Sequence, residues 1–134
     1  MPNHWLLKTE PSTYSWTDLE RDKTAVWDGV SNPVALRNLA AMKVGDDALI
    51  YHTGDEKAVV GLARVTKAAY ADPKAKDPKL LVVDLAPARR LSRSVTLAEI
   101  KADARFRESP LVRQGRLSVV QLTAEQFRRL TDSS

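Results

Sequence analysis

The sequence predicts an α+β fold in which short helices pack around a small mixed or antiparallel β-barrel. Its apolar patterns give about five or six short strands, interspersed with four or five short helices. Several of these strands follow one another without the long crossover helix that a parallel, doubly wound sheet needs. A length of 134 residues suits one hydrophobic core. We therefore expect a single domain over residues 1–134.

Composition removes several classes of function. The chain has no cysteine, which excludes disulfide frameworks, thiolate zinc sites and cysteine nucleophiles. Its two histidines are too few for a histidine-rich metal site. No apolar run approaches the roughly 18 residues of a membrane-spanning helix, and the N-terminus lacks a signal-peptide pattern. We expect a cytoplasmic protein without a membrane partner, whose net charge of +4 gives weak attraction to polyanions.

The first part of the chain predicts a strand, a helix and a second strand. The apolar run at residues 4–9 gives a strand that ends before Pro11, because proline lacks the N–H that a sheet ladder uses. Ser15 stands three residues before an acidic residue, a pattern related to the capping box, and starts a short helix. Trp16 lies on the inner face of this helix, so we assign it to packing. Residues 25–27 form a brief strand.

The middle of the chain predicts a helix, two strands and a loop. Pro33 suits the first turn of a helix that ends before Gly45. Residues 48–51 and 58–65 are apolar and read as buried strands. Residues 71–78 contain two Asp-Pro pairs and no apolar residue larger than alanine, which indicates a loop.

The last part predicts strand, helix, strand and helix. Residues 80–85 form a strand that pairs most simply with the preceding one, as a hairpin across the loop. Thr96 opens a short helix through a capping box. The basic segment 105–116 is irregular, with a turn or helix entry at Ser109-Pro110. Residues 117–122 form the last strand, and Thr123 caps the final helix.

The stretch from Trp27 to Asn38, WDGVSNPVALRN, is the first candidate for a binding site. It places a large aromatic residue at a strand end, directly before an Asp-Gly turn. A nucleobase that stacks on such a ring gains roughly 1–3 kcal/mol, and the backbone of a turn can read the polar edge of the base. The alternative is that Trp27 is an ordinary core residue, since aromatic residues dominate protein cores.

Several longer motifs identify a family resemblance over essentially the whole chain. In this order, they closely resemble the EVE domain family of the PUA-like superfamily: WLLKTEPSTYSW, WDGVSNPVALRN, AMKVGDDALIYHTG, the loop with its Asp-Pro pairs, VTLAEIK and PLVRQGRLSV. The resemblance implies a PUA-like β-barrel with flanking helices. It also implies a pocket similar to the modified-base pocket of the related YTH domains, because EVE domains are implicated in binding modified bases in DNA or RNA.

Carried over to matching positions, the resemblance gives a set of candidate binding residues. Trp27 becomes the stacking wall, the strand end at residues 8–10 lines the pocket, and Asn32 reads a polar edge of the base. The full set is Lys8, Thr9, Glu10, Tyr14, Trp27, Val30, Asn32, Asn38, Tyr51, His52, Arg116, Leu117 and Ser118. Four arginines, Arg89, Arg93, Arg113 and Arg116, are candidates for phosphate contacts.

This chain departs from the pattern expected of many relatives after Asn32. Pro33-Val34 stand where an aromatic residue and polar residues are expected, and Leu36 stands where a polar or basic residue is common. These departures leave the preferred base open, together with the roles of Arg37 and Asn38.

Three functions follow as alternatives. The first is a monomeric binding module for a modified base in DNA or RNA, with no catalytic residue, metal or cofactor. The second is an amidohydrolase acting on a modified nucleoside, because the similar ASCH-type domains use lysine, threonine and glutamate, the residue types at positions 8–10. Adjacent strand residues alternate faces, which disfavours that triad and makes an enzyme the lesser expectation. The third is a binder of free nucleosides or similar small molecules, since the charge excess is only +4.

Overall fold

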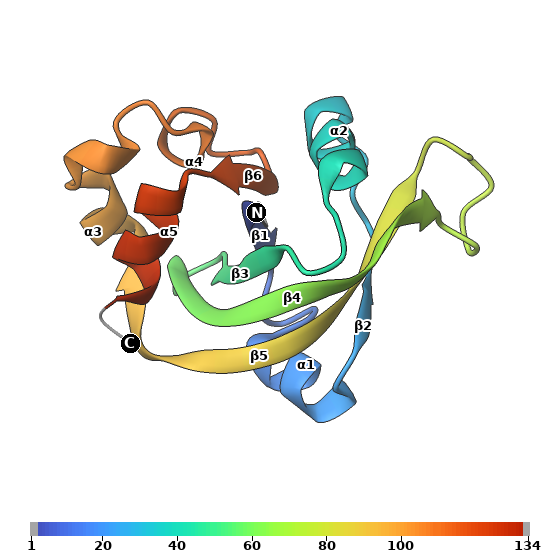
Figure 1. Ribbon diagram of the computed structural model, residues 1–134, viewed down its shortest axis with the longest axis horizontal. Coiled ribbons are helices and arrows are strands. Elements are labelled where there is room, and N and C mark those ends of the chain that lie inside the picture. The colour runs from blue at the N-terminus through green and yellow to red at the C-terminus, as the bar shows by residue number, and fades with distance from the viewer. Residues whose placement is uncertain (1–2, 133–134) are drawn as a thin grey trace.

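The computed structural model describes residues 3–132 and confirms the α+β class. Six strands form one mixed sheet, with short helices around it (Figure 1). The elements in chain order are β1 (His4–Thr9), α1 (Trp16–Asp22), β2 (Ala25–Trp27), α2 (Pro33–Ala41), β3 (Asp47–His52), β4 (Ala58–Ala71), β5 (Leu81–Thr96), α3 (Leu97–Lys101), the 3-10 helix η1 (Ala104–Phe106), α4 (Pro110–Arg113), β6 (Val119–Leu122) and α5 (Ala124–Thr131).

The strand order in the sheet is β2-β5-β4-β3-β1-β6. β1 pairs with β3 in parallel, and the other neighbouring strands are antiparallel. β2 and β6 are the two edges of the sheet, and within residues 3–132 no backbone pairing joins them. The expected closed barrel is therefore not confirmed. The long strands β4 and β5 curve strongly, as Figure 1 shows, but both edge strands are short.

Side-chain caps start the helices at the predicted positions. Ser15 and Thr123 each complete a reciprocal capping box, and Thr96 accepts a hydrogen bond from the backbone N–H three residues on. Asn32 caps α2, directly before the predicted Pro33. Each cap satisfies backbone donors that the first helical turn leaves without a partner.

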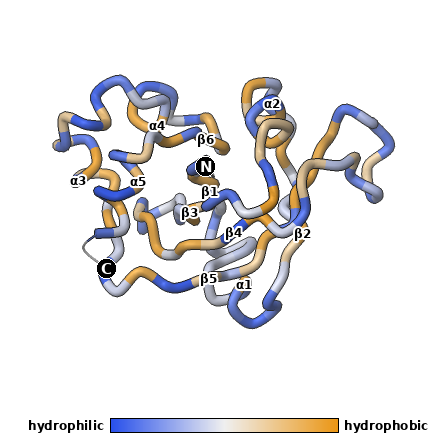
Figure 2. Tube along the Cα trace, in the orientation of Figure 1, coloured by the Kyte–Doolittle hydropathy of each residue, from blue (hydrophilic) through white to orange (hydrophobic). Residues whose placement is uncertain are grey.

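The β4–β5 hairpin is much longer than the sequence predicted. Residues 58–65 and 80–85 were expected as strands, whereas β4 extends to Ala71 and β5 to Thr96. The added segments carry many exposed polar or small residues, so they lack the apolar pattern of a buried strand. They are held by pairing with each other, and several register shifts accommodate their curvature. Figure 2 shows that the loop at the tip of this hairpin is hydrophilic, as expected for residues 71–78.

The C-terminal region is shorter in strand and richer in helix than predicted. β6 begins at Val119 rather than at residue 117, and the segment expected to be irregular contains η1 and α4. Ser109 caps α4 through its side chain, so the helix begins at the entry predicted for Ser109-Pro110. No helix within residues 3–132 has the length and apolar character required to cross a membrane.

The core lies between the sheet and the surrounding helices, and Trp16 is the contact that fixes α1. As predicted, Trp16 is a packing residue, with 1% of its surface exposed. Its ring lies against Gly61 of β4, and an added Cβ at Gly61 would lie 2.5 Å from the ring atoms Cε2 and Cε3. Only a residue without a side chain allows this approach. On the same side of the sheet, the backbone N–H of Trp16 donates to His52 Nε2 at 3.0 Å.

Gly61→Ala tests this contact. We expect the substitution to lower the free energy of unfolding by about 1–3 kcal/mol, because the new methyl group overpacks a rigid aromatic ring. Denaturant unfolding measures the change. Gly115→Ala is the matched control, since an added Cβ there meets nothing within 4 Å. Equal stability of the two variants would contradict the contact.

Candidate functional site

A cleft of about 360 Å³ opens beside the end of β1. We call it the Trp27 cleft. Its walls come from the end of β1, the loop before α1, and β2 with the turn that follows. The lining residues are Thr9, Thr13, Tyr14, Val26, Trp27, Asp28 and Gly29.

The Trp27 cleft brings together three of the predicted binding residues. Trp27 pairs with Val83 of β5 through the sheet ladder, and 8% of its surface is exposed. The Tyr14 ring meets the Trp27 ring edge to face, with ring centroids 6.2 Å apart at an interplanar angle of 84°. Thr9 Oγ1 donates to the carbonyl oxygen of Tyr14 at 2.8 Å. The cleft therefore has an aromatic wall whose position is fixed from two sides.

The loop at residues 10–15 is held by hydrogen bonds at both ends. The backbone N–H groups of Thr13 and Tyr14 both donate to the Glu10 carbonyl oxygen at 2.9 Å. At the other end, His52 Nε2 accepts the Trp16 N–H. Because Nε2 accepts, the proton of the neutral imidazole lies on Nδ1, which is 2.7 Å from Glu56 Oε1 and donates to it. The structure thus places His52 behind the loop, outside the cleft lining.

The Tyr14 phenol is held as a neutral group. Burial, together with the hydrogen bond that its hydroxyl donates to Asp22 Oδ2 at 2.9 Å, raises the pKa of Tyr14 to about 12. The ring therefore stays uncharged at neutral pH, and its hydroxyl oxygen faces α1.

Three predicted residues belong to the segment around α2 and do not line the Trp27 cleft. Val30 is buried. Asn32 Oδ1 accepts from the N–H groups of Val34 at 2.9 Å and of its neighbour, residue 35, at 3.1 Å, as an N-cap. Asn38 Nδ2 donates to the Val119 carbonyl oxygen at 2.8 Å, which ties α2 to β6. These contacts hold the helix in place.

Lys8 and Tyr51 lie in a second cleft, of about 220 Å³. We call it the lysine cleft, and its cationic lining residues are Lys8, Lys57 and Lys101. Lys8 Nζ donates to the Gly115 carbonyl oxygen at 2.8 Å and lies 5.6 Å from the centre of the Tyr51 ring. Burial lowers the pKa of Lys8 and raises the pKa of Tyr51.

The three polar residues at the end of β1 do not converge. Lys8 lines the lysine cleft, and Thr9 lines the Trp27 cleft. Glu10 accepts from the Ser12 N–H at 3.2 Å and the Ser12 hydroxyl at 3.1 Å, and these bonds lower the pKa of Glu10. The alternation expected for adjacent strand residues thus separates Thr9 from Lys8, two of the residue types of an ASCH-type triad. The Glu10 carboxylate also accepts from the hydroxyl of Thr53, a lining residue of the lysine cleft, at 3.4 Å.

The remaining predicted residues precede β6. Arg116 is exposed, Leu117 is buried and Ser118 is half-buried. The Ser118 carbonyl oxygen accepts from the backbone N–H of Lys8 at 2.9 Å, so this segment supports β1. None of the three is a lining residue of either cleft.

Sequence reasoning missed Thr13 and Val26 as lining residues. Both lie next to recognised features: Thr13 is two residues after Pro11, and Val26 directly precedes Trp27. The Asp-Gly turn was recognised, and its Gly29 has a φ of 78°, a conformation that favours glycine. The signal that could have identified Thr13 is the reversal of the chain after the end of β1, next to Pro11.

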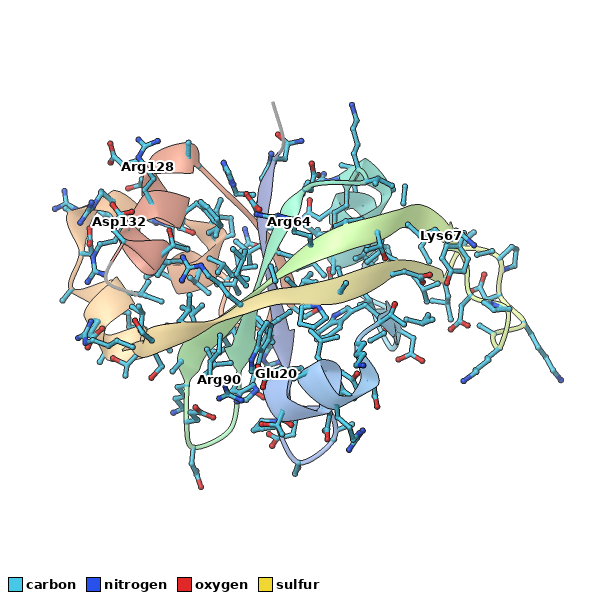
Figure 3. The ribbon with its side chains drawn as sticks, turned by 60° about the horizontal axis from the view of Figure 1, so that its bottom comes forward. Glu20, Arg64, Lys67, Arg90, Arg128 and Asp132 are labelled. Carbon is cyan, nitrogen blue, oxygen red and sulfur yellow. The ribbon has the colours of Figure 1, made fainter. Side chains whose placement is uncertain are left out.

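Most arginines near the sheet form ion pairs. Arg93 pairs with Glu99 at 2.6 Å, and Arg113 with Glu108 at 3.0 Å. Arg90 pairs with Glu20 at 2.8 Å, and Figure 3 shows these two side chains beneath β5. A phosphate that bound Arg93 or Arg113 would have to compete with these carboxylates. Across residues 3–132, no cluster of three or more histidine, aspartate or glutamate side chains is arranged to hold a metal ion.

Tyrosine titration tests the environment of the Trp27 cleft. The pKa values of Tyr14 and Tyr70 are both raised to about 12, and that of Tyr51 is also raised, so the folded protein should show little tyrosinate absorbance at pH ~10, the ordinary midpoint. Since the folded-state pKa of Tyr14 is raised, its contribution to stability is complete below pH ~10 and is lost as the pH rises through about 12.

Asp22→Asn should lower the pKa of Tyr14, because it removes a negative acceptor, and Tyr14→Phe assigns the signal. A folded protein whose tyrosines titrate as they do in the unfolded chain would contradict this description.

Comparison with known proteins places these features in a family. A model of the EVE domain matches residues 3–133. Human thymocyte nuclear protein 1 is 32% identical over an alignment 161 residues long, which covers 95% of this chain and 72% of that protein.

Solved structures also resemble this chain over almost its whole length. A Rhodopseudomonas palustris protein superposes with a TM-score of 0.91 at 35% identity, covering 98% of this chain and 92% of its own. Human THYN1 protein, in complex with DNA containing 5-methylcytosine, superposes with a TM-score of 0.89 at 31% identity, covering 97% of this chain and 96% of its own. An ASCH protein from Zymomonas mobilis, at 12% identity and a TM-score of 0.60, shares the fold alone. The chain belongs to the EVE domain family.

Proposed function

We propose that this protein binds a modified nucleobase in a nucleic acid, and that the Trp27 cleft receives the base. The observation that carries the proposal is the combination of an aromatic wall with a polar rim in one cleft. A volume of about 360 Å³ falls within the range of small-ligand sites, roughly 300–1,000 Å³.

The lining supplies the interactions that an extruded base needs. Extrusion of a base from a duplex costs a few kcal/mol, and stacking on an aromatic ring with hydrogen bonds to the base edge offsets that cost. Trp27 provides the stacking surface, and Val26 provides an apolar contact for a methyl group. The Asp28 carboxylate is an acceptor of the kind that pairs with the N4 amino group of cytosine.

Methylated cytosine in DNA is the first ligand to test. The support for DNA comes from the human THYN1 protein, which has been solved in complex with DNA containing 5-methylcytosine and which covers 97% of this chain. RNA with a modified base and a free modified nucleoside present the same base chemistry, so both belong in the assay. Size-exclusion chromatography in the same buffer tests the expected monomer.

Equilibrium binding to oligonucleotides with and without 5-methylcytosine tests the proposal. We expect selective binding of the methylated strand, and a loss of roughly 5- to 150-fold in Trp27→Ala, which corresponds to a stacking contribution of about 1–3 kcal/mol. Trp27→Phe should lose less, because it keeps an aromatic face. Asp28→Asn should reduce affinity for cytosine bases while leaving stability unchanged, since Asp28 is exposed.

Because Trp27 is buried, Trp27→Ala also loses core packing, and its fold must be checked by circular dichroism. Asp55→Asn is the matched control for Asp28→Asn, as an exposed acidic residue outside both clefts. Methyl-selective binding that survives in both Trp27 variants and in Asp28→Asn would exclude the Trp27 cleft as the base pocket. Equal binding of methylated and unmethylated strands would reject the function itself.

A further inference from the structure

The charged residues that line the lysine cleft are all lysines. Its ionisable lining groups are the ammonium groups of Lys8, Lys57 and Lys101 and the hydroxyl of Tyr51, with no carboxylate among the lining residues. Three arginines of the sheet, Arg64, Arg90 and Arg93, by contrast, each have a carboxylate partner. The lining residues therefore contribute positive charge and no negative charge of their own, and the carboxylate in contact with them is that of Glu10, which accepts from the Thr53 hydroxyl at 3.4 Å.

Lys8 has spare hydrogen-bonding capacity. An ammonium group carries three N–H donors, and Lys8 donates one of them to a neutral acceptor, the Gly115 carbonyl oxygen. This bond and the neighbouring Tyr51 ring hold the ammonium at the cleft wall. Two donors remain for a ligand, on a group that is already positioned and partly removed from water.

Tyr51 adds a neutral donor. Only 3% of its surface is exposed, and that small fraction faces the cleft that it lines. Burial raises the pKa of the phenol, so it keeps its proton at neutral pH. Within residues 3–132 its hydroxyl makes no recorded hydrogen bond, which leaves the O–H available to an acceptor.

Lys57 lies at a strained position of the backbone. Its φ of 46° is in the left-handed region, where a side chain costs energy that glycine avoids. Glycine is the default residue at such a position, yet this chain places a lysine whose side chain lines the cleft. Neither Lys57 nor Lys101 forms an ion pair with any residue in the described part of the chain.

The apolar part of the lining has room for more than one ionic group. Leu97, Leu111 and Val112 form a hydrophobic surface beside the lysines. A neighbouring depression of about 330 Å³ shares Lys57, Leu97 and Lys101 with the lysine cleft and extends it along α3. Glu56 also lines this depression, and its carboxylate is hydrogen-bonded to His52 Nδ1 at 2.7 Å. An anion with an attached sugar or base matches this combination better than a bare ion does.

We propose that the lysine cleft is a second binding site, which takes a phosphate group carried by a nucleotide. Three lysine ammonium groups and the Tyr51 hydroxyl supply donors to this cleft, and ammonium groups bind phosphate as point charges without a required orientation. Lys8 and Thr9 are adjacent in β1 and line different clefts, so this site is separate from the Trp27 cleft and does not depend on the function proposed for it.

Calorimetric titration at low salt with deoxycytidine monophosphate, deoxycytidine and inorganic phosphate tests the site. We expect the monophosphate to bind at least about tenfold more tightly than the nucleoside, because only it engages the lysines. Lys57→Gly should weaken binding of the monophosphate roughly tenfold. The same variant should keep or raise the thermal midpoint, since glycine relieves the left-handed strain.

Lys23→Gly is the matched control. Lys23 is the other non-glycine residue with positive φ in residues 3–132, at 65°, and it caps the end of α1 away from both clefts. Lys23→Gly removes the same charge and the same kind of strain as Lys57→Gly. Because Lys23 does not line the lysine cleft, binding of the monophosphate should not change. Lys8→Met is a second test. It removes the ammonium group but keeps the apolar stem of the side chain, and it should also weaken binding of the monophosphate.

Competition with a 5′-phosphorylated, unmodified oligonucleotide distinguishes the two sources of the phosphate. Displacement of the monophosphate assigns the site to a strand phosphate, and its absence assigns the site to a free nucleotide; both support a phosphate site. Equal binding of nucleotide and nucleoside would overturn the proposal, as would unchanged binding in Lys57→Gly and Lys8→Met. Methylcytosine selectivity in the same variants reports on the Trp27 cleft separately.

Discussion

The contact of Trp16 with Gly61 is the constraint on which the Trp27 cleft depends. The indole ring of Trp16 lies where any side chain at position 61 would be, so α1 approaches β4 closely. The bond from the Trp16 N–H to His52 fixes the same residue from β3. Together these contacts set the end of the loop at residues 10–15, which carries Thr13 and Tyr14 to the cleft. Gly61 and His52, which do not line the Trp27 cleft, thereby position the loop that carries Tyr14 to its wall.

A second constraint is the alternation of side chains along β1. Because adjacent residues of a strand point to opposite faces, Lys8 and Thr9 serve different clefts. The parallel pairing of β1 with β3 places Tyr51 beside Lys8 in the register. One strand end thus supplies a hydroxyl to an aromatic cleft and an ammonium to a cationic one. The same alternation separates Thr9 from Lys8, two of the residue types that hydrolysis by an ASCH-type triad would bring together.

The sequence predicted the features that depend on neighbours in the chain. Capping at Ser15 and Thr123 is formed by residues three apart, so the helix starts were visible. The outer halves of β4 and β5 were not, because they are stabilised by pairing across the hairpin rather than by an apolar pattern. The candidate site behaves similarly. The structure brings Thr9, Tyr14 and Trp27 together in one cleft, whereas the position of His52 behind the loop depends on contacts that no local pattern encodes.

Nuclear magnetic resonance mapping with a short oligonucleotide containing one 5-methylcytosine tests the central claim most directly, since it locates the base without altering the protein. If the Trp27 cleft receives the base, the largest chemical-shift changes fall on the Trp27 indole and on the amides of Thr9, Thr13 and Tyr14, and of the turn after β2. Removal of the methyl group should reduce these changes more than any others. Methyl-dependent changes confined to the lysine cleft or to the β4–β5 hairpin would contradict the account.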